Sequence, residues 1–418
     1  MLSTNFLNKP VAVFIFAALI LYACTPAPYR ENSGISKKPL AGKDIQAMAL
    51  PSKPSIDKIP FVKQEIDREK QSVKRTVLEG RMVGKDILIA VLPFENLSGL
   101  PAPLHDLRQS LLDSLSQKGL NILGKEALER FMLKHRIRYT GGIDASIARA
   151  LKDETGAMAV LLTSLELFSD LSPPKIALTS RLVATDDNMP VLWMKGEGLA
   201  GDDAPGLLNL RLIEDKALLV KKAVELISAS LKDYVSGRRR SYDISIKGTT
   251  FWPNVIYRSP VIDRKIKYRL AVLPFYNVSE RKNAGDIMAL HFINKMRTLE
   301  NIDVIEPGTI RQLSLNYRII MDDGVSMANA DIIFSKVNAD LILTGKVMDY
   351  HDYQGSSGTA KVDFSTMLID RKSNEVVWSS KSYNSGDDGV FFFDLGRTNT
   401  AHAMASDMAE HVVRMMFK

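Results

Sequence analysis

The chain has 418 residues, of which 45% are hydrophobic and 7% aromatic, which is the composition of a globular protein with room for two or three domains. Its formal net charge of +7 alone would be compatible with nucleic-acid binding. No predicted helix interleaves basic side chains with stacking aromatic rings, so we expect no nucleic-acid binding. The single cysteine excludes an internal disulfide, and the domains must be stable without one.

Residues 1–23 are typical of an export signal. Lys9 precedes the uncharged run VAVFIFAALILYA, which is too short to span a bilayer comfortably and suits the core of a signal peptide. The run leads into LYAC, and Cys24 is the only cysteine of the chain. This stretch resembles the bacterial lipoprotein signal, in which the cysteine is acylated and becomes the mature N-terminus. An uncleaved transmembrane anchor is the alternative.

The lipoprotein resemblance implies three acyl chains at Cys24, and three chains should hold a protein firmly where one binds only marginally. Thr25 rather than Asp follows, which implies the outer membrane under the sorting rule of enteric bacteria. We therefore expect a lipid anchor at the outer membrane, facing the periplasm. Residues 24–84 are rich in Pro, Ser and Lys and predict an extended tether. Within it, residues 61–81 could form a charged helix, because acidic residues come early and basic residues late, which suits the helix dipole.

An internal repeat dominates the rest of the chain. AVLPFENLS at 90–98 returns 181 positions later as AVLPFYNVS at 271–279. The apolar residues predict a buried strand, and the Asn and Ser side chains suit a turn in which they cap backbone N–H groups. In each copy, apolar residues at helical spacing then predict an amphipathic helix. We interpret these repeated residues as scaffold.

Both copies continue in parallel with a short apolar strand, a second helix and a third apolar strand, in which Thr163 is set opposite Thr344. A strand, a polar turn and another strand then predict a hairpin, and an amphipathic helix closes each copy. The predicted unit is β-α-β-α-β-β-β-α. The expected fold class is α/β (α+β), with tandem domains at 85–236 and 266–418 and a connector at 237–265.

The motif AVLPFxNxS, with ADLILTGKV at 339–347 and MLIDRKSNEVVWSS at 367–380, resembles the domain found in the N-terminal part of TolB and in the envelope lipoproteins CsgG and LpoB. The resemblance implies a non-enzymatic, lipid-anchored periplasmic protein that binds other envelope proteins or associates with itself. CsgG-like proteins form rings whose inserted hairpins build an outer-membrane channel, and LpoB-like proteins activate a peptidoglycan synthase. The loops SDLSPPK and HDYQGSSGT are short and polar, unlike the hairpins of a channel.

A search for chemistry gives no catalytic motif: HExxH, GxSxG and C-x-x-C are all absent. We therefore expect no enzyme, no catalytic residue and no cofactor. Among the six histidines, His402 and His411 are nine residues apart and half a turn out of phase on the last helix, so we expect no metal site. The acidic pairs that begin at 186, 202, 322 and 387 are interpreted as turns rather than calcium ligands.

Two aromatic clusters are candidates for protein binding. The connector FWPNVIYRSP carries Phe251, Trp252 and Tyr257, which would form a binding hot spot if they are unburied and a clasp if they pack against one domain. The segment GVFFFDLGRT puts three phenylalanines before the final helix, either as core around a bend or as a contact for a partner. They are Phe391, Phe392 and Phe393.

The leading hypothesis is a lipid-anchored periplasmic adaptor or assembly factor that acts by protein–protein binding. One alternative is a CsgG-like oligomeric secretion or channel component of the outer membrane, and another is an LpoB-like activator of a peptidoglycan synthase. A hydrolase would require a polar cluster that assembles only in three dimensions.

Overall fold

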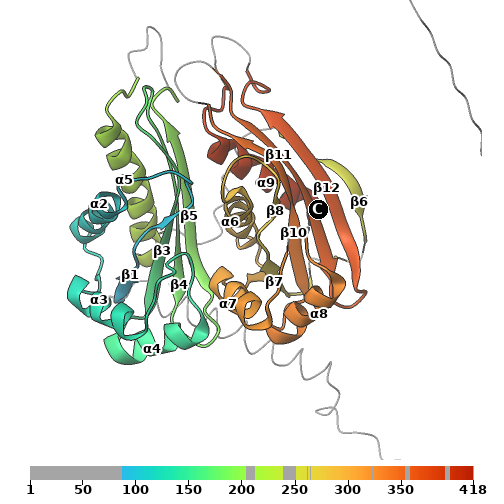
Figure 1. Cartoon of the computed structure of the whole chain (residues 1–418), viewed down its shortest axis with the longest axis horizontal. Coiled ribbons are helices and arrows are strands. Elements are labelled where there is room, and N and C mark those ends of the chain that lie inside the picture. Colours follow the sequence, from blue (N-terminus) through green and yellow to red (C-terminus); the bar gives the residue numbers. More distant parts are fainter. Residues whose placement is uncertain are drawn as a thin grey trace, which may run out of the picture. The chain divides into compact units, whose positions relative to one another are not determined.

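A computed structural model describes residues 87–418, apart from 204–211, 239–250, 261, 264, 322–323, 354–357, 391–395 and 418 (Figure 1). These residues form helices and two β-sheets, one sheet for each copy of the repeat, and the fold is α/β as the sequence predicts. Both copies belong to one compact unit. Across this described part, none of the helices has the length and apolar character needed to cross a bilayer.

The first copy places a mixed sheet between helices. In chain order it contains β1 (Ile89–Val91), β2 (Glu95–Asn96), α2 (Leu104–Gln117), α3 (Lys125–Lys134), α4 (Ala145–Thr155), β3 (Ala159–Ser169), β4 (Lys175–Ala184), β5 (Val191–Ala200) and α5 (Lys216–Val235). The sheet has the order β1-β3-β4-β5. β1 and β2 run parallel to β3, and the other neighbours are antiparallel.

The second copy repeats this plan and adds one strand from the connector. It contains β7 (Tyr268–Val272), β8 (Tyr276–Asn277), α6 (Ala284–Met296), β9 (Ile302–Val304), α7 (Pro307–Tyr317), α8 (Met327–Lys336), β10 (Leu341–His351), β11 (Lys361–Asp370), β12 (Glu375–Ser385) and α9 (Ala401–Met416). The connector strand β6 (Asn254–Arg258) pairs with β12, so that the sheet has the order β6-β12-β11-β10-β7-β9.

The repeated turn has the structure that its sequence predicts. Asn96 Oδ1 accepts a hydrogen bond from the backbone N–H of Ser98 at 3.0 Å. Asn277 Oδ1 accepts the same bond from Ser279 at 3.1 Å. The predicted turn is therefore confirmed, because each side chain satisfies the backbone that follows its strand.

The sequence missed one helix in each copy. α4 and α8 lie between the second predicted helix and the third strand. The buried hydrophobic residues of α4 are Ala148 and Leu151, and their i, i+3 spacing is typical of a helix. Both ends of α4 have clear local causes. The Asp144 carboxylate caps its first turn, and Gly156 ends the helix at a φ of 75°. Each copy therefore has one helix more than predicted.

Two expectations about strands also need correction. The short strand predicted near residue 122 of the first copy is only an isolated bridge between Ile89 and Ile122. The pairing register also shifts the alignment between the third strands of the two copies by one residue from the predicted alignment. Glu95 pairs with Ser164 in the first copy, and Tyr276 pairs with Lys346 in the second. Thr163 is therefore equivalent to Gly345 and not to Thr344.

The two copies share a core. α2 and α5 pack together, and α5 packs on β4 and β5. On the other side of the first sheet, β5 packs against α6 and α9 of the second copy, and these two helices also pack on β10 and β11 (Figure 1). Met194 of β5 and Met408 of α9 belong to the same buried cluster. Helices of the second copy thus cover part of one face of the first sheet.

A fully buried ion pair crosses this contact. Arg181, on β4, donates from Nε and Nη2 to the Glu306 carboxylate at 3.2 and 3.0 Å, and both side chains are inaccessible to solvent. Arg181 Nη2 also donates to the Gly141 carbonyl. Glu306 Oε1 accepts from the Gly308 N–H and so caps α7. Removing one member of a buried pair leaves an uncompensated charge, which is far more costly than replacing both.

We expect Glu306→Leu to lower the free energy of unfolding by about 3–5 kcal/mol, because it leaves the Arg181 guanidinium buried and unpaired. The double variant Arg181→Met with Glu306→Leu should regain most of that loss. Equilibrium urea denaturation measures both. The exposed pair Arg149–Asp187 is a matched control, and Asp187→Ala should cost at most about 1 kcal/mol. Equal losses for Glu306→Leu and Asp187→Ala would show that the buried pair does not join the copies.

Candidate functional site

The connector is held in place by a buried anchor. Phe251 is 5% exposed and belongs to the core that the two copies share. Next to it, β6 pairs antiparallel to β12, with Tyr257 opposite Ser379. The backbone N–H of Ser259 donates to the Val377 carbonyl at 2.8 Å and extends this attachment. The connector is therefore a clasp on the second sheet, which is one of the two arrangements that the sequence left open.

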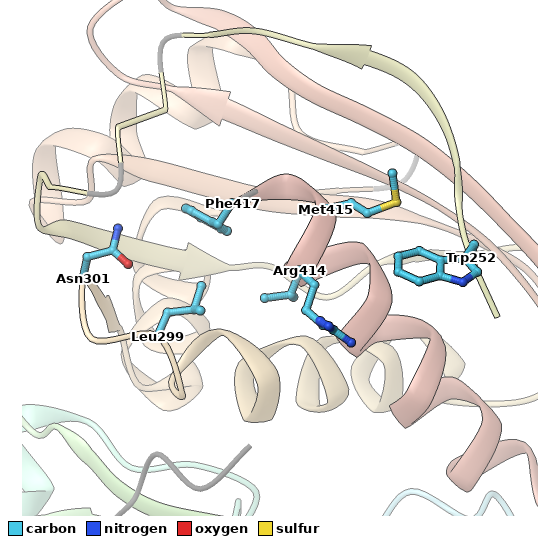
Figure 2. Close-up of a pocket in the computed structure, with 7 residues that line it drawn as sticks. Trp252, Leu299, Asn301, Arg414, Met415 and Phe417 are labelled. Carbon is cyan, nitrogen blue, oxygen red and sulfur yellow. The ribbon is translucent and has the colours of Figure 1, made fainter. Parts of the chain in front are cut away.

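Trp252 lies at the surface beside a small apolar pocket (Figure 2). Its side chain is 50% exposed, and its ring packs edge-on against His411 with the centroids 4.6 Å apart. The pocket has a volume of about 380 Å³. It is lined by Trp252, Leu299, Asn301, Val413, Arg414, Met415 and Phe417. Tryptophan, methionine and arginine are enriched where proteins bind one another, and Met415 can adapt its shape to a partner.

β6 also offers a free sheet edge. It is the terminal strand of the second sheet, and no described strand pairs with its outer side. Ile256 and Tyr257 are 57% and 49% exposed on this strand. An edge strand presents unpaired backbone groups that can add a strand from another chain, and exposed apolar side chains supply specificity. β6, Trp252 and the adjoining pocket together form what we call the connector surface.

The structure places the predicted site residues in different environments. Phe251 is buried, so it can anchor the connector surface but cannot contact a partner directly. Trp252 and Tyr257 are both half-exposed. Their role in binding stays a prediction. Cys24 and the three phenylalanines at 391–393 lie outside the described residues.

A group of titratable side chains, which the sequence did not predict, is buried between the copies. It consists of Glu166 on β3, His291 on α6 and His402 on α9, and we call it the Glu–His–His cluster. His402 Nδ1 lies 2.5 Å from Glu166 Oε2, and His291 Nε2 lies 3.8 Å from the same oxygen. Thr179 Oγ1 donates to the other oxygen, Oε1, at 2.5 Å. The expectation of no metal site rested on the spacing of the histidines along the chain, whereas these two come from different helices.

Local backbone features place the cluster. The β3–β4 register shifts between Leu165 and Leu167, and a bulge of this kind redirects the side chain at its centre, which is Glu166. His402 fits because two neighbours on β5 are glycines. A Cβ at Gly196 or Gly198 would lie only 2.9 or 2.7 Å from the His402 ring. The one sequence signal was Glu166 itself, an acidic residue within the apolar run AVLLTSLELF.

The electrostatics of the cluster separate its two histidines. Burial alone would raise the pKa of Glu166, but the charge and hydrogen bond of His402, with smaller contributions from His291 and Thr179, lower this pKa to about 2. Burial, reinforced by His402, lowers the pKa of His291 to about 3. Burial opposes a charge on His402, yet the adjacent Glu166 carboxylate raises the His402 pKa. Near neutral pH the cluster therefore holds a carboxylate and a neutral His291.

Searches of protein-family models and of curated protein sequences give no match to this chain. Among solved structures, a PelC dodecamer from Paraburkholderia phytofirmans is 18% identical, with 38% of this chain and 94% of that chain covered and a TM-score of 0.26. Lipoprotein GNA1162 from Neisseria meningitidis is 21% identical over 34% and 98% of the two chains, at a TM-score of 0.25. The LpoB C-terminal domain from Salmonella enterica is 14% identical over 30% and 93%, at 0.24. We transfer no residue role from these structures.

Phe251 is buried and Trp252 is half-exposed, so replacing each by alanine should lower the free energy of unfolding by different amounts. Phe251→Ala removes a core side chain and should lower the free energy of unfolding by about 3 kcal/mol. Trp252→Ala removes a half-exposed ring and should cost about 1 kcal/mol. Urea denaturation of the two variants side by side measures the difference. If both variants lose the same stability, the assignment of Phe251 as the anchor of the connector surface is wrong.

Proposed function

We propose that this chain is a lipid-anchored periplasmic adaptor or assembly factor of the cell envelope, which acts by binding other proteins. The observation that supports this best is the connector surface, where Trp252 and Tyr257 are half-exposed on and beside an edge strand that the buried Phe251 holds in place. The resemblance of the Cys24 segment to a lipoprotein signal supports the anchor.

The physical case rests on preorganisation. Ordering a loop during binding consumes part of the available binding energy, and a surface that is already fixed avoids this cost. β6 is hydrogen-bonded to β12 along one side, so its backbone direction is set before a partner arrives. An incoming strand could pair with the outer side of β6, while Trp252 and the apolar pocket accept a side chain. The partner class is therefore an envelope protein with an extended, partly apolar segment.

The alternative of a CsgG-like ring requires this chain to assemble with copies of itself. The contact between the two repeats is head-to-tail, and such a contact can in principle repeat from molecule to molecule into a ring or filament. The strand registers make Gly196 and Gly198 of the first sheet equivalent to Lys381 and Tyr383 of the second. At the positions where the first sheet has glycines beside His402, the second sheet has the exposed side chains of Lys381 and Tyr383. The same contact cannot simply repeat, which favours the adaptor. An LpoB-like activator would be an adaptor whose partner is a peptidoglycan synthase.

The binding role is tested by a photo-crosslinking amino acid placed at Trp252 or Tyr257 of the full-length protein in cells that normally make it. We expect a discrete covalent adduct with an envelope protein from both positions. The matched control is Leu133, an exposed apolar residue of α3 in the first copy, from which we expect no such adduct. No adduct at 252 and 257, or the same adducts from 133, would contradict the proposal.

The anchor is tested separately by Cys24→Ser. If Cys24 is acylated, this variant should move from the membrane fraction to the soluble fraction, because three acyl chains supply the membrane affinity. Metabolic labelling with a clickable fatty acid should mark the unaltered chain and leave the variant unlabelled. Labelling that persists in Cys24→Ser, or an unaltered chain that never takes the label, would refute the lipid anchor without affecting the connector surface.

A further inference from the structure

We propose that the Glu–His–His cluster binds a divalent transition-metal ion, with Zn²⁺ as the best match, and that this ion joins the two copies. The three possible ligand atoms, one from each of Glu166, His291 and His402, all lie within 4.8 Å of one another. Zinc in proteins binds imidazole nitrogen and carboxylate oxygen at about 2.0–2.2 Å, so small side-chain shifts would bring all three to one ion. This inference is independent of the connector surface.

The hydrogen bonds of the cluster leave His291 poorly satisfied. An ion pair with Glu166 needs only His402, whose Nδ1 lies 2.5 Å from the carboxylate. The Nε2 of His291 reaches Tyr350 Oη at 3.5 Å and Glu166 at 3.8 Å, both longer than ordinary hydrogen bonds. A buried polar group without a good partner is costly. A metal ion at this position would give His291 Nε2 a strong partner.

Side chains around the cluster hold its possible ligands by hydrogen bonds, as the outer partners of known metal sites do. The Thr179 hydroxyl occupies Glu166 Oε1 and leaves Oε2 facing both imidazoles. Such outer partners fix the direction of a metal-bound carboxylate and are commonly worth about 10–100-fold in affinity. The Tyr350 hydroxyl lies close to His291 Nε2, where a fourth ligand, either this hydroxyl or a water, would complete the coordination.

The donor set selects the class of metal. Calcium and magnesium take oxygen ligands, whereas two imidazoles with one carboxylate suit zinc and related transition metals. All three side chains are buried, which suits a structural ion more than one that must admit a substrate. Glu166 belongs to the first copy and both histidines to the second, so an ion bound here would stabilise the contact between them by mass action.

The first test uses the unaltered full-length protein, extracted in mild detergent without chelator. We expect one zinc per chain by elemental analysis, and a rise in the thermal midpoint when Zn²⁺ is returned to chelator-treated protein. Cobalt in place of zinc should give the visible absorption of a tetrahedral nitrogen and oxygen site. A protein that contains no metal and whose midpoint does not respond to added Zn²⁺ would overturn the proposal, even if every variant failed to fold.

Variants then locate the ion. Glu166→Gln and His291→Gln should each lose the bound zinc, and Thr179→Val should weaken Zn²⁺ affinity by about 10–100-fold. The matched control is His411→Gln, because His411 is also buried on α9 but its Nδ1 bonds to the Asp407 carbonyl. This control should keep one zinc per chain. Full zinc content and unchanged affinity in His291→Gln would place the ion elsewhere and reject the assignment.

Discussion

One face of the first sheet is buried by helices of the second copy as well as by its own α3 and α4, and this shared burial organises the described structure. The helices α2 and α5 cover one side of that sheet, whereas β5 on the other side packs against α6 and α9 of the second copy. An apolar sheet face must be covered by a second layer for the fold to be stable. The duplication therefore supplies part of a covering layer, and the two repeats lie in one compact unit with a shared buried core.

The contact between the two copies includes buried polar side chains as well as apolar ones. Arg181 pairs with Glu306 across the contact, and Lys175, also buried, donates to the carbonyls of Tyr353 and Asn399. Buried charges of this kind add little net stability, but an unpaired partner is costly, so they disfavour any other alignment of the copies. Phe251 enters the same core and thereby fixes the connector surface to this unit. The connector surface and the fold thus share one buried contact.

The sequence predicted the features that are local and missed those that depend on the meeting of distant segments. The repeat predicted the strands, and the chemistry of Asn96 and Asn277 predicted the turns. α4 has a local helical signal in the spacing of Ala148 and Leu151 and could have been predicted, whereas the one-residue slip at Thr163 needed the pairing register. The convergence of His291 and His402 could not be read from spacing, since the two helices meet only after the copies pack.

The most direct test compares the unfolding of the two copies within the intact chain. Trp193 lies in the first sheet and Trp378 in the second, and both are buried. Two full-length variants, each with Trp252 replaced and only one of these two tryptophans retained, report on one copy apiece by fluorescence during urea denaturation. We expect the two transitions to coincide in midpoint and slope, because α6 and α9 of the second copy also pack on β5 of the first sheet. Two separate transitions, one for each copy, would show that the repeats are independent domains and that their shared core is not what holds the fold together.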